Sequence, residues 1–252
     1  MRTLRGTWRL CRAVLHGLHG LLVVLLRFPF LDRPGRQARI CWWSAKMMRS
    51  LGIDLRVSGE FHAGAKLVVV NHVSWLDIMA VHAVCPEARF VSKAEVRHWP
   101  LVGRLVDAGG TLYIERERRR DALRVVHQIA QALQDGDSVA VFPEGTTGDG
   151  QVLLPFHANL LQAAISTTSP VQPVALRFAD RRSKVTASAA YVGETTLAQS
   201  LWMLACGDGI TATLSVLSAR ATAHADRRSL SETLRIDIQQ ALDDIDARHR
   251  TG

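Results

Sequence analysis

Short apolar segments alternate with helical patterns along most of the chain, and this order constrains the fold more than any other feature. The helical spacing of apolar residues is clearest at 121–135 and again at 229–248. Such alternation predicts an α/β fold, a single domain with a largely parallel mixed sheet flanked by helices. The expected strands are Leu55–Val57, Lys66–Val70, Arg89–Ser92, Gly110–Ile114, Ser138–Phe142, Val171–Leu176 and Thr211–Val216.

The first 50 residues differ in composition from the rest of the chain. Two helical stretches are expected there, at about 7–28 and 36–51, because prolines and a glycine interrupt the pattern between them. Residues 1–50 hold ten Lys and Arg and one acid, 10 − 1 = +9, whereas residues 51–252 hold 21 basic and 22 acidic residues, 21 − 22 = −1. We therefore expect a helical docking segment at 1–50 and an α/β domain at 51–252.

The basic segment is also apolar, which indicates a membrane as its partner. Leucines and valines fill positions 21–26, and Trp42 and Trp43 follow. Arginine mixed with leucine and tryptophan is typical of a segment in a membrane interface, and the apolar run is short of the ~20 residues that a span needs. A signal peptide has a similar pattern, but no small-x-small cleavage site follows Leu26. Nucleic acid is a less favoured partner for so apolar a segment.

A histidine and an aspartate follow the apolar run at 67–70. On a continuous helix, the separation of five residues would place His72 and Asp77 about 140° apart, so they meet only if His72 lies in a turn before the helix. Ser74 is then the expected N-cap, and a plain capping box is the structural alternative. In the catalytic interpretation, Asp77 accepts a hydrogen bond from one ring nitrogen of His72 and leaves the other to act as a general base.

Polar residues follow other predicted strands as well. Glu144, Gly145 and Thr146 form either an ordinary turn or a set of amides, hydroxyls and a carboxylate for a polar headgroup. Arg116 stands at a strand end, where a guanidinium can hold a phosphate through two hydrogen bonds. Pro173 alone indicates only a strand edge or entry. Because parallel strands deliver their carboxyl ends to one sheet edge, we expect a shared pocket.

Taken in order, four blocks resemble the glycerolipid acyltransferase family. The H-x-x-x-x-D block is similar to residues 72–77, the aromatic-Ile-x-Arg block to 113–116, the F-P-E-G-T block to 142–146, and the late proline block to 171–174. The resemblance covers about residues 40–220, and the order of the blocks is more specific than any one of them.

The resemblance implies acyl transfer from an acyl carrier protein or coenzyme A thioester to the free hydroxyl of a lysophospholipid, with 1-acyl-glycerol-3-phosphate as the first candidate and phosphatidic acid as its product. It also implies direct attack by the lipid hydroxyl on the thioester, without a metal, a bound cofactor or an acyl-enzyme. The implied location is the cytoplasmic face of the inner membrane, and nucleic acid is not an implied partner. By this resemblance, His72 acts as the base and Asp77 orients it. The acceptor headgroup is bound by Arg116, Glu144, Gly145 and Thr146.

One departure and one alternative qualify these expectations. Many lysophosphatidate enzymes of the family carry Arg after F-P-E-G-T, whereas Thr147 stands here, which resembles members that acylate lyso-ornithine lipid or another lysolipid. A non-catalytic basic peripheral-membrane protein is the alternative of another class. The four cysteines are widely spaced, without a C-x-x-C pair or a metal-like histidine pattern, and are typical of thiols in a reducing compartment.

Overall fold

The computed structural model describes residues 2–114 and 119–249, and it gives the backbone alone for residues 119–122. The described chain forms a seven-stranded sheet with the order β1-β7-β6-β2-β5-β3-β4. Neighbouring strands are parallel except β6 and β7, so the predicted largely parallel mixed sheet is confirmed. The strands are β1 Asp54–Ser58, β2 Leu67–Val70, β3 Ala88–Lys93, β4 Leu112–Ile114, β5 Ser138–Val141, β6 Val171–Ala179 and β7 Thr211–Val216.

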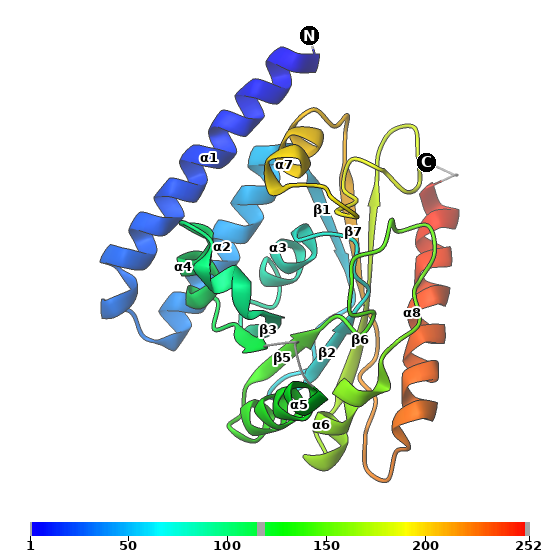
Figure 1. Ribbon diagram of the computed structural model, residues 1–252. Helices are drawn as coiled ribbons and strands as arrows, with labels where there is room; N and C mark the ends of the chain where they lie inside the picture. The colour runs from blue at the N-terminus through cyan, green and yellow to red at the C-terminus, as the bar shows by residue number, and fades with distance from the viewer. Residues whose placement is uncertain (1, 115–118, 250–252) are drawn as a thin grey trace.

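Helices cover both faces of the sheet (Figure 1). Alternate residues of β2 point to opposite faces, so Val68 and Val70 join the core formed with α2, α3 and α7, whereas Leu67 and Val69 join the core formed with α5, α6 and α8. All four residues are fully buried, which explains why β2 is apolar without alternation. The helices are α1 Arg2–Leu26, α2 Arg33–Leu51, α3 Leu76–His82, α4 Val102–Ala108, α5 Arg119–Gln134, α6 Leu161–Ser166, α7 Leu197–Ala205 and α8 Arg227–His249, with short 3-10 turns η1 Phe28–Phe30, η2 Ala94–His98 and η3 Ala158–Leu160.

The N-terminal helices form a hairpin, as the sequence predicts, although both begin earlier than expected. α1 starts at Arg2, and Asp32 starts α2 by accepting a hydrogen bond from Gly35 N at 2.9 Å. Reciprocal hydrogen bonds join the two helices, because His16 Nε2 donates to the Trp43 carbonyl at 3.0 Å and Trp43 Nε1 donates to the His16 carbonyl at 3.1 Å. The hairpin is therefore held by specific polar contacts as well as by packing.

Three arginines of α1 dock the hairpin on the α/β domain. Arg2 and Arg9 donate to backbone carbonyls just after α7, with Arg9 Nη1 2.7 Å from the Gly207 oxygen, and Arg5 pairs with Asp208 at 3.0 Å. Cations at a helix C-terminus are stabilising, because the last carbonyls carry partial negative charge. These three charges are therefore used within the protein, at the end of α7.

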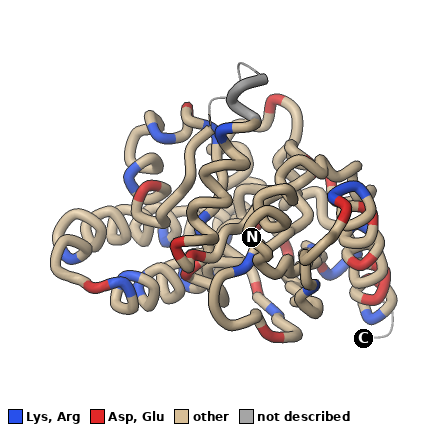
Figure 2. Tube along the Cα trace, turned by 90° about the horizontal axis from the view of Figure 1, so that it is seen from below, with Lys and Arg blue, Asp and Glu red and all other residues tan. Residues whose placement is uncertain are grey.

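The outer face of the hairpin is apolar and exposed. α1 has the length and composition of a membrane-crossing helix. It is longer than the uninterrupted apolar run of the sequence predicts. Only 17% of its most apolar stretch is buried in the protein. The turn between α1 and α2 lies at the left of Figure 2 and carries one basic and one acidic residue, Arg27 and Asp32, among apolar ones. The large apolar side chains exposed on the hairpin are Leu4, Trp8, Val14, Leu15, Leu18, Leu22, Leu25, Leu26, Phe30 and Trp42.

A buried histidine at the end of α3 gives the fold a predicted dependence on pH. His82 is 6% exposed and donates from Nε2 to the Ala88 carbonyl at 2.9 Å, and burial lowers the pKa of its imidazole. Below about pH 6.5 the unfolded chain binds this proton more readily than the folded chain. The free energy of unfolding should therefore fall by up to about 1.4 kcal/mol per pH unit, from about pH 6.5 down to the folded-state pKa.

Urea unfolding between about pH 7 and about pH 5 measures this slope. The His82→Gln variant keeps a donor for the Ala88 carbonyl but has no imidazole to titrate. Its free energy of unfolding should therefore change less with pH, by the amount that His82 contributes. Equal slopes in the two proteins would show that His82 does not contribute.

Candidate active site

The predicted base lies in the turn that follows β2 at the carboxyl edge of the sheet. Asn71, directly before it, bridges β2 to β6, because its amide donates to the Leu176 carbonyl at 2.9 Å and accepts from Leu176 N at 2.7 Å. These two bonds continue the pairing of the strands beyond their last regular residue. The backbone that enters His72 is therefore held firmly to the sheet.

His72 and Asp77 form the predicted pair. His72 Nδ1 lies 2.7 Å from Asp77 Oδ2, and the side chain of Asp77 is fully buried, whereas that of His72 is 19% exposed. Because the carboxylate accepts a hydrogen bond from Nδ1–H, the neutral imidazole carries its lone pair on Nε2, which can accept a proton. The turn geometry that the sequence requires for this contact is confirmed.

The capping prediction for Ser74 is wrong in one respect. The Ser74 hydroxyl has no hydrogen-bond partner among the described residues, and Trp75 occupies the N-cap position without a side-chain bond to the helix backbone. Asp77 performs the local capping alone, because Oδ2 also accepts from Val73 N at 2.7 Å and from Ser74 N at 2.9 Å. One carboxylate oxygen therefore holds both the imidazole and the backbone of the turn.

The imidazole is also held by an aromatic ring from the F-P-E-G-T segment. Phe142 stacks on His72 with ring centroids 3.8 Å apart and an interplanar angle of 9°, and Phe90 stacks behind Phe142 at 5.5 Å. Stacking restricts rotation of the imidazole about its side-chain bonds, so its orientation is determined from two sides. The sequence contained Phe142 within a motif, but its contact with His72 was not predicted.

Glu144 contacts the histidine through the backbone. Its Oε1 accepts from His72 N at 2.6 Å and its Oε2 accepts from Leu154 N at 2.9 Å, and the residue is 5% exposed. Burial raises the pKa of Glu144, and the two amide hydrogen bonds oppose this shift. Gly148 N in turn donates to the His72 carbonyl at 2.8 Å, so the segment that follows β5 holds both backbone groups of His72.

The other predicted site residues lie in or near this loop. Gly145 has φ +72°, a left-handed conformation that favours glycine, and a side chain there would come within 3.0 Å of the His157 ring. Thr146 is exposed. The Thr147 hydroxyl donates to the Tyr191 carbonyl. Arg116 lies outside the described residues.

Pro173 is not at a strand edge, contrary to its simplest interpretation. It is the third residue of β6, between β2 and β7. Its missing N–H is tolerated because the ladder with β7 begins one residue later, at the Val174–Val216 pair. The Pro173 carbonyl still accepts from Leu217 N at 3.0 Å.

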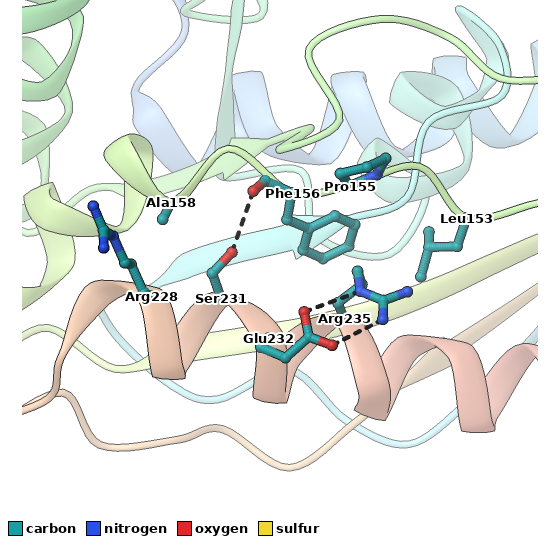
Figure 3. A pocket seen from close by; sticks show the side chains of 8 residues that line it. All are labelled: Leu153, Pro155, Phe156, Ala158, Arg228, Ser231, Glu232 and Arg235. Carbon is teal, nitrogen blue, oxygen red and sulfur yellow. Dashed lines mark hydrogen bonds and ion pairs between the residues drawn. The ribbon is translucent and has the colours of Figure 1, made fainter.

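A cavity of about 410 Å³ lies elsewhere, between residues 153–158 and the first turns of α8 (Figure 3). An ion pair between Glu232 and Arg235, 2.8 Å long, lies at its rim. None of the predicted catalytic residues lines this cavity. Within the described residues, no cluster of three or more His, Cys, Asp or Glu is arranged to hold a metal ion.

The site pairs a partly exposed histidine with a buried carboxylate at the carboxyl edge of an α/β sheet, an arrangement that can serve general-base chemistry. The family model described as Acyltransferase matches residues 54–177, which include this site. Together with the relatives described next, this match shows that the chain belongs to the acyltransferase family.

Relatives named for two different acceptors share the same percentage identity with the chain, over different lengths. A lyso-ornithine lipid O-acyltransferase of Pseudomonas aeruginosa is 36% identical over 90% of this chain and 87% of its own length. A 1-acyl-sn-glycerol-3-phosphate acyltransferase of Neisseria gonorrhoeae is 36% identical over 78% of this chain and 77% of its own. The crystal structure of the 1-acyl-sn-glycerophosphate acyltransferase PlsC from Thermotoga maritima shares the fold, with a TM-score of 0.76, 19% identity and 98% of each chain covered.

Proposed function

We propose that the protein transfers a fatty acyl chain from a thioester of acyl carrier protein or coenzyme A to the free hydroxyl of a membrane lysolipid. The observation that carries the proposal is the contact of 2.7 Å between His72 and the buried Asp77, which leaves Nε2 of a partly exposed imidazole free to accept a proton. The first candidate acceptor is 1-acyl-glycerol-3-phosphate, and its product is phosphatidic acid.

In the proposed reaction, Nε2 of His72 takes the proton of the lipid hydroxyl as its oxygen attacks the thioester carbonyl. The tetrahedral intermediate collapses, the carbon–sulfur bond breaks, and the thiolate takes the proton back from the imidazolium. The products are an ester and a free thiol. The carboxylate of Asp77 stabilises the imidazolium between the two proton transfers, as a buried carboxylate does in other histidine-based sites.

For the acceptor headgroup we propose Arg116, Gly145 and Thr146. The exposed side chain of Thr146 and the left-handed backbone of Gly145, two and one residues after Glu144, support this assignment. For Glu144, a positioning role is better supported, because both its carboxylate oxygens already accept from backbone amides. Its contact with a headgroup stays a prediction.

A second acceptor, lyso-ornithine lipid, is favoured by Thr147. Its hydroxyl bonds to the Tyr191 carbonyl, so this position offers a structural contact instead of a cation for a phosphomonoester. The Pseudomonas aeruginosa relative, which carries this acceptor in its name, covers 90% of the chain. The two acceptors differ in charge, and a direct comparison separates them.

Thiol release from acyl-coenzyme A and from acyl carrier protein, measured with lysophosphatidate and lyso-ornithine lipid side by side, tests the proposal. The Thr147→Arg variant should shift the ratio of kcat/KM values toward lysophosphatidate by about tenfold, because it adds a charge-assisted hydrogen bond. Thr147→Val, which removes only the hydroxyl, is the control and should not produce this shift. Absence of lysolipid-dependent thiol release with either donor would contradict the proposed function.

We propose that the protein works on the cytoplasmic face of the inner membrane, with the exposed apolar face of α1 and α2 in the lipid. The ten exposed apolar side chains of the hairpin support this location. The four free cysteines fit a reducing compartment.

A further inference from the structure

A second exposed apolar element follows β3. The chain leaves the strand through η2 and reaches α4 by the turn Trp99-Pro100-Leu101. All residues from 97 to 101 are exposed, with Trp99 41% and Leu101 55% exposed. A tryptophan and a leucine at the tip of a turn thus each leave a large apolar surface open to solvent.

The turn is folded tightly and is not a loose loop. Leu101 has φ 65° and ψ −48°, and Val102 N donates to the Pro100 carbonyl at 2.7 Å, which together form a classic γ-turn, a rare and strained conformation. Gly103 N donates to the Trp99 carbonyl at 2.9 Å. A side chain at Gly103 would lie 2.2 Å from the backbone oxygen of Arg97, so glycine permits this close fold.

The base of the turn is anchored to the sheet. The Arg97 guanidinium lies 5.6 Å from the centroid of the Tyr113 ring in β4, and the Tyr113 hydroxyl donates to Asp107 of α4 at 2.8 Å. Strained turns persist where the surroundings hold them, and here the contacts hold two apolar side chains in an outward position. The exposure of Trp99 and Leu101 is therefore built into the fold.

The turn lies next to the hairpin and on the same sheet edge as the active site. β3 is parallel to β5, which is parallel to β2, so the segment after β3 leaves the sheet at the edge where His72 and Glu144 lie. α4 contacts α1, and Figure 1 shows α4 beside the hairpin of α1 and α2. Residues 93–104 hold three basic residues and one acid, a balance that suits an anionic lipid surface.

We propose that Trp99 and Leu101 insert into the phospholipid bilayer as a second membrane contact beside the hairpin. This inference rests on the proposed membrane location, because the turn leads into α4, which contacts α1 of the hairpin. A hairpin alone leaves the α/β domain free to tilt about one line of contact, whereas two contacts hold the sheet edge against the lipid. A lysolipid then has a short path from the bilayer to His72.

Fluorescence of an environment-sensitive thiol label tests the contact. The label is attached to the full chain at Leu101→Cys, in a Cys11→Ser background because Cys11 is the exposed cysteine among the four. Leu22→Cys reports on the hairpin. Ile236→Cys, on α8 and 45% exposed in the native protein, is the matched control on the other face of the sheet.

On vesicles of phosphatidylcholine and phosphatidylglycerol, the label at 101 should shift to the blue and be quenched by lipid-borne nitroxides, as the label at 22 should, whereas the label at 236 should not respond. A response at 22 without one at 101 would overturn the second contact and leave the hairpin docking intact. Silence at both positions would overturn both membrane proposals, while thiol release with a detergent-dispersed lysolipid would still report the proposed chemistry independently.

Trp99→Ser/Leu101→Ser provides a functional readout. Its kcat/KM on vesicle-borne lysolipid should fall by at least about tenfold, because two large apolar groups no longer enter the lipid, and its activity in detergent should be unchanged. An equal loss in both assays would point to a damaged fold. Together with a silent label at 101, it would count against the inference.

Discussion

Replacing His72 with alanine is expected to lower kcat/KM for acyl transfer by about 10²–10⁴-fold, because the acceptor hydroxyl loses its general base. The fold should persist, since His72 is partly exposed and its backbone bonds to Glu144 and Gly148 do not need the side chain. Lysolipid-dependent thiol release measures the activity, and thermal unfolding checks the fold.

His62→Ala is the matched control for this variant. His62 is exposed and precedes β2, at the opposite end of the strand from His72, so its imidazole is remote from the proposed chemistry. We expect the control to keep wild-type activity. Near-normal turnover by the His72→Ala variant with a verified acyl donor would show that another group is the base.

Replacing Asp77 with asparagine should lower kcat by a similar factor, about 10²–10⁴-fold, for a different reason. A neutral amide cannot stabilise the imidazolium. Asp77 Oδ1 is buried without a hydrogen-bond partner among the described residues, so an amide nitrogen in its place would be unsatisfied. We expect a loss of about 1–3 kcal/mol in the free energy of unfolding as well.

Activity measured where the variant is fully folded separates the two effects of Asp77→Asn. Loss of the carboxylate should keep kcat low in the folded variant, which a purely structural defect would not do. Asp244→Asn, an exposed substitution on α8, controls for the change of charge and should leave both activity and stability unchanged. Near-normal kcat of the folded Asp77→Asn variant would contradict its proposed role.

The prediction of strands from sequence was accurate for a physical reason that β2 and β5 illustrate. Both are short, buried and, apart from Ser138, composed of apolar residues between polar turns, so burial on two faces is visible in the local sequence. The short helices α4, α6 and α7 were not predicted, because segments of six to nine residues show too few turns for a helical period.

The pairing of His72 with Asp77 was predictable because both residues belong to one turn, and a five-residue separation has few geometries in which the side chains meet. The contact between His72 and Glu144 was not, because these residues are 72 positions apart and a bond between a carboxylate and a distant backbone amide leaves no local pattern. The same holds for the stacking of Phe142 on His72.

Local sequence was enough to determine the strands, the two N-terminal helices, the polar ends of the strands and the turn that joins base to carboxylate, because each depends on neighbours along the chain. Only the tertiary structure decided the order of the strands, the use of Arg2, Arg5 and Arg9 at the end of α7, and the hold of the loop after β5 on His72. Those features join distant segments, and their geometry exists only once the sheet has brought the segments together.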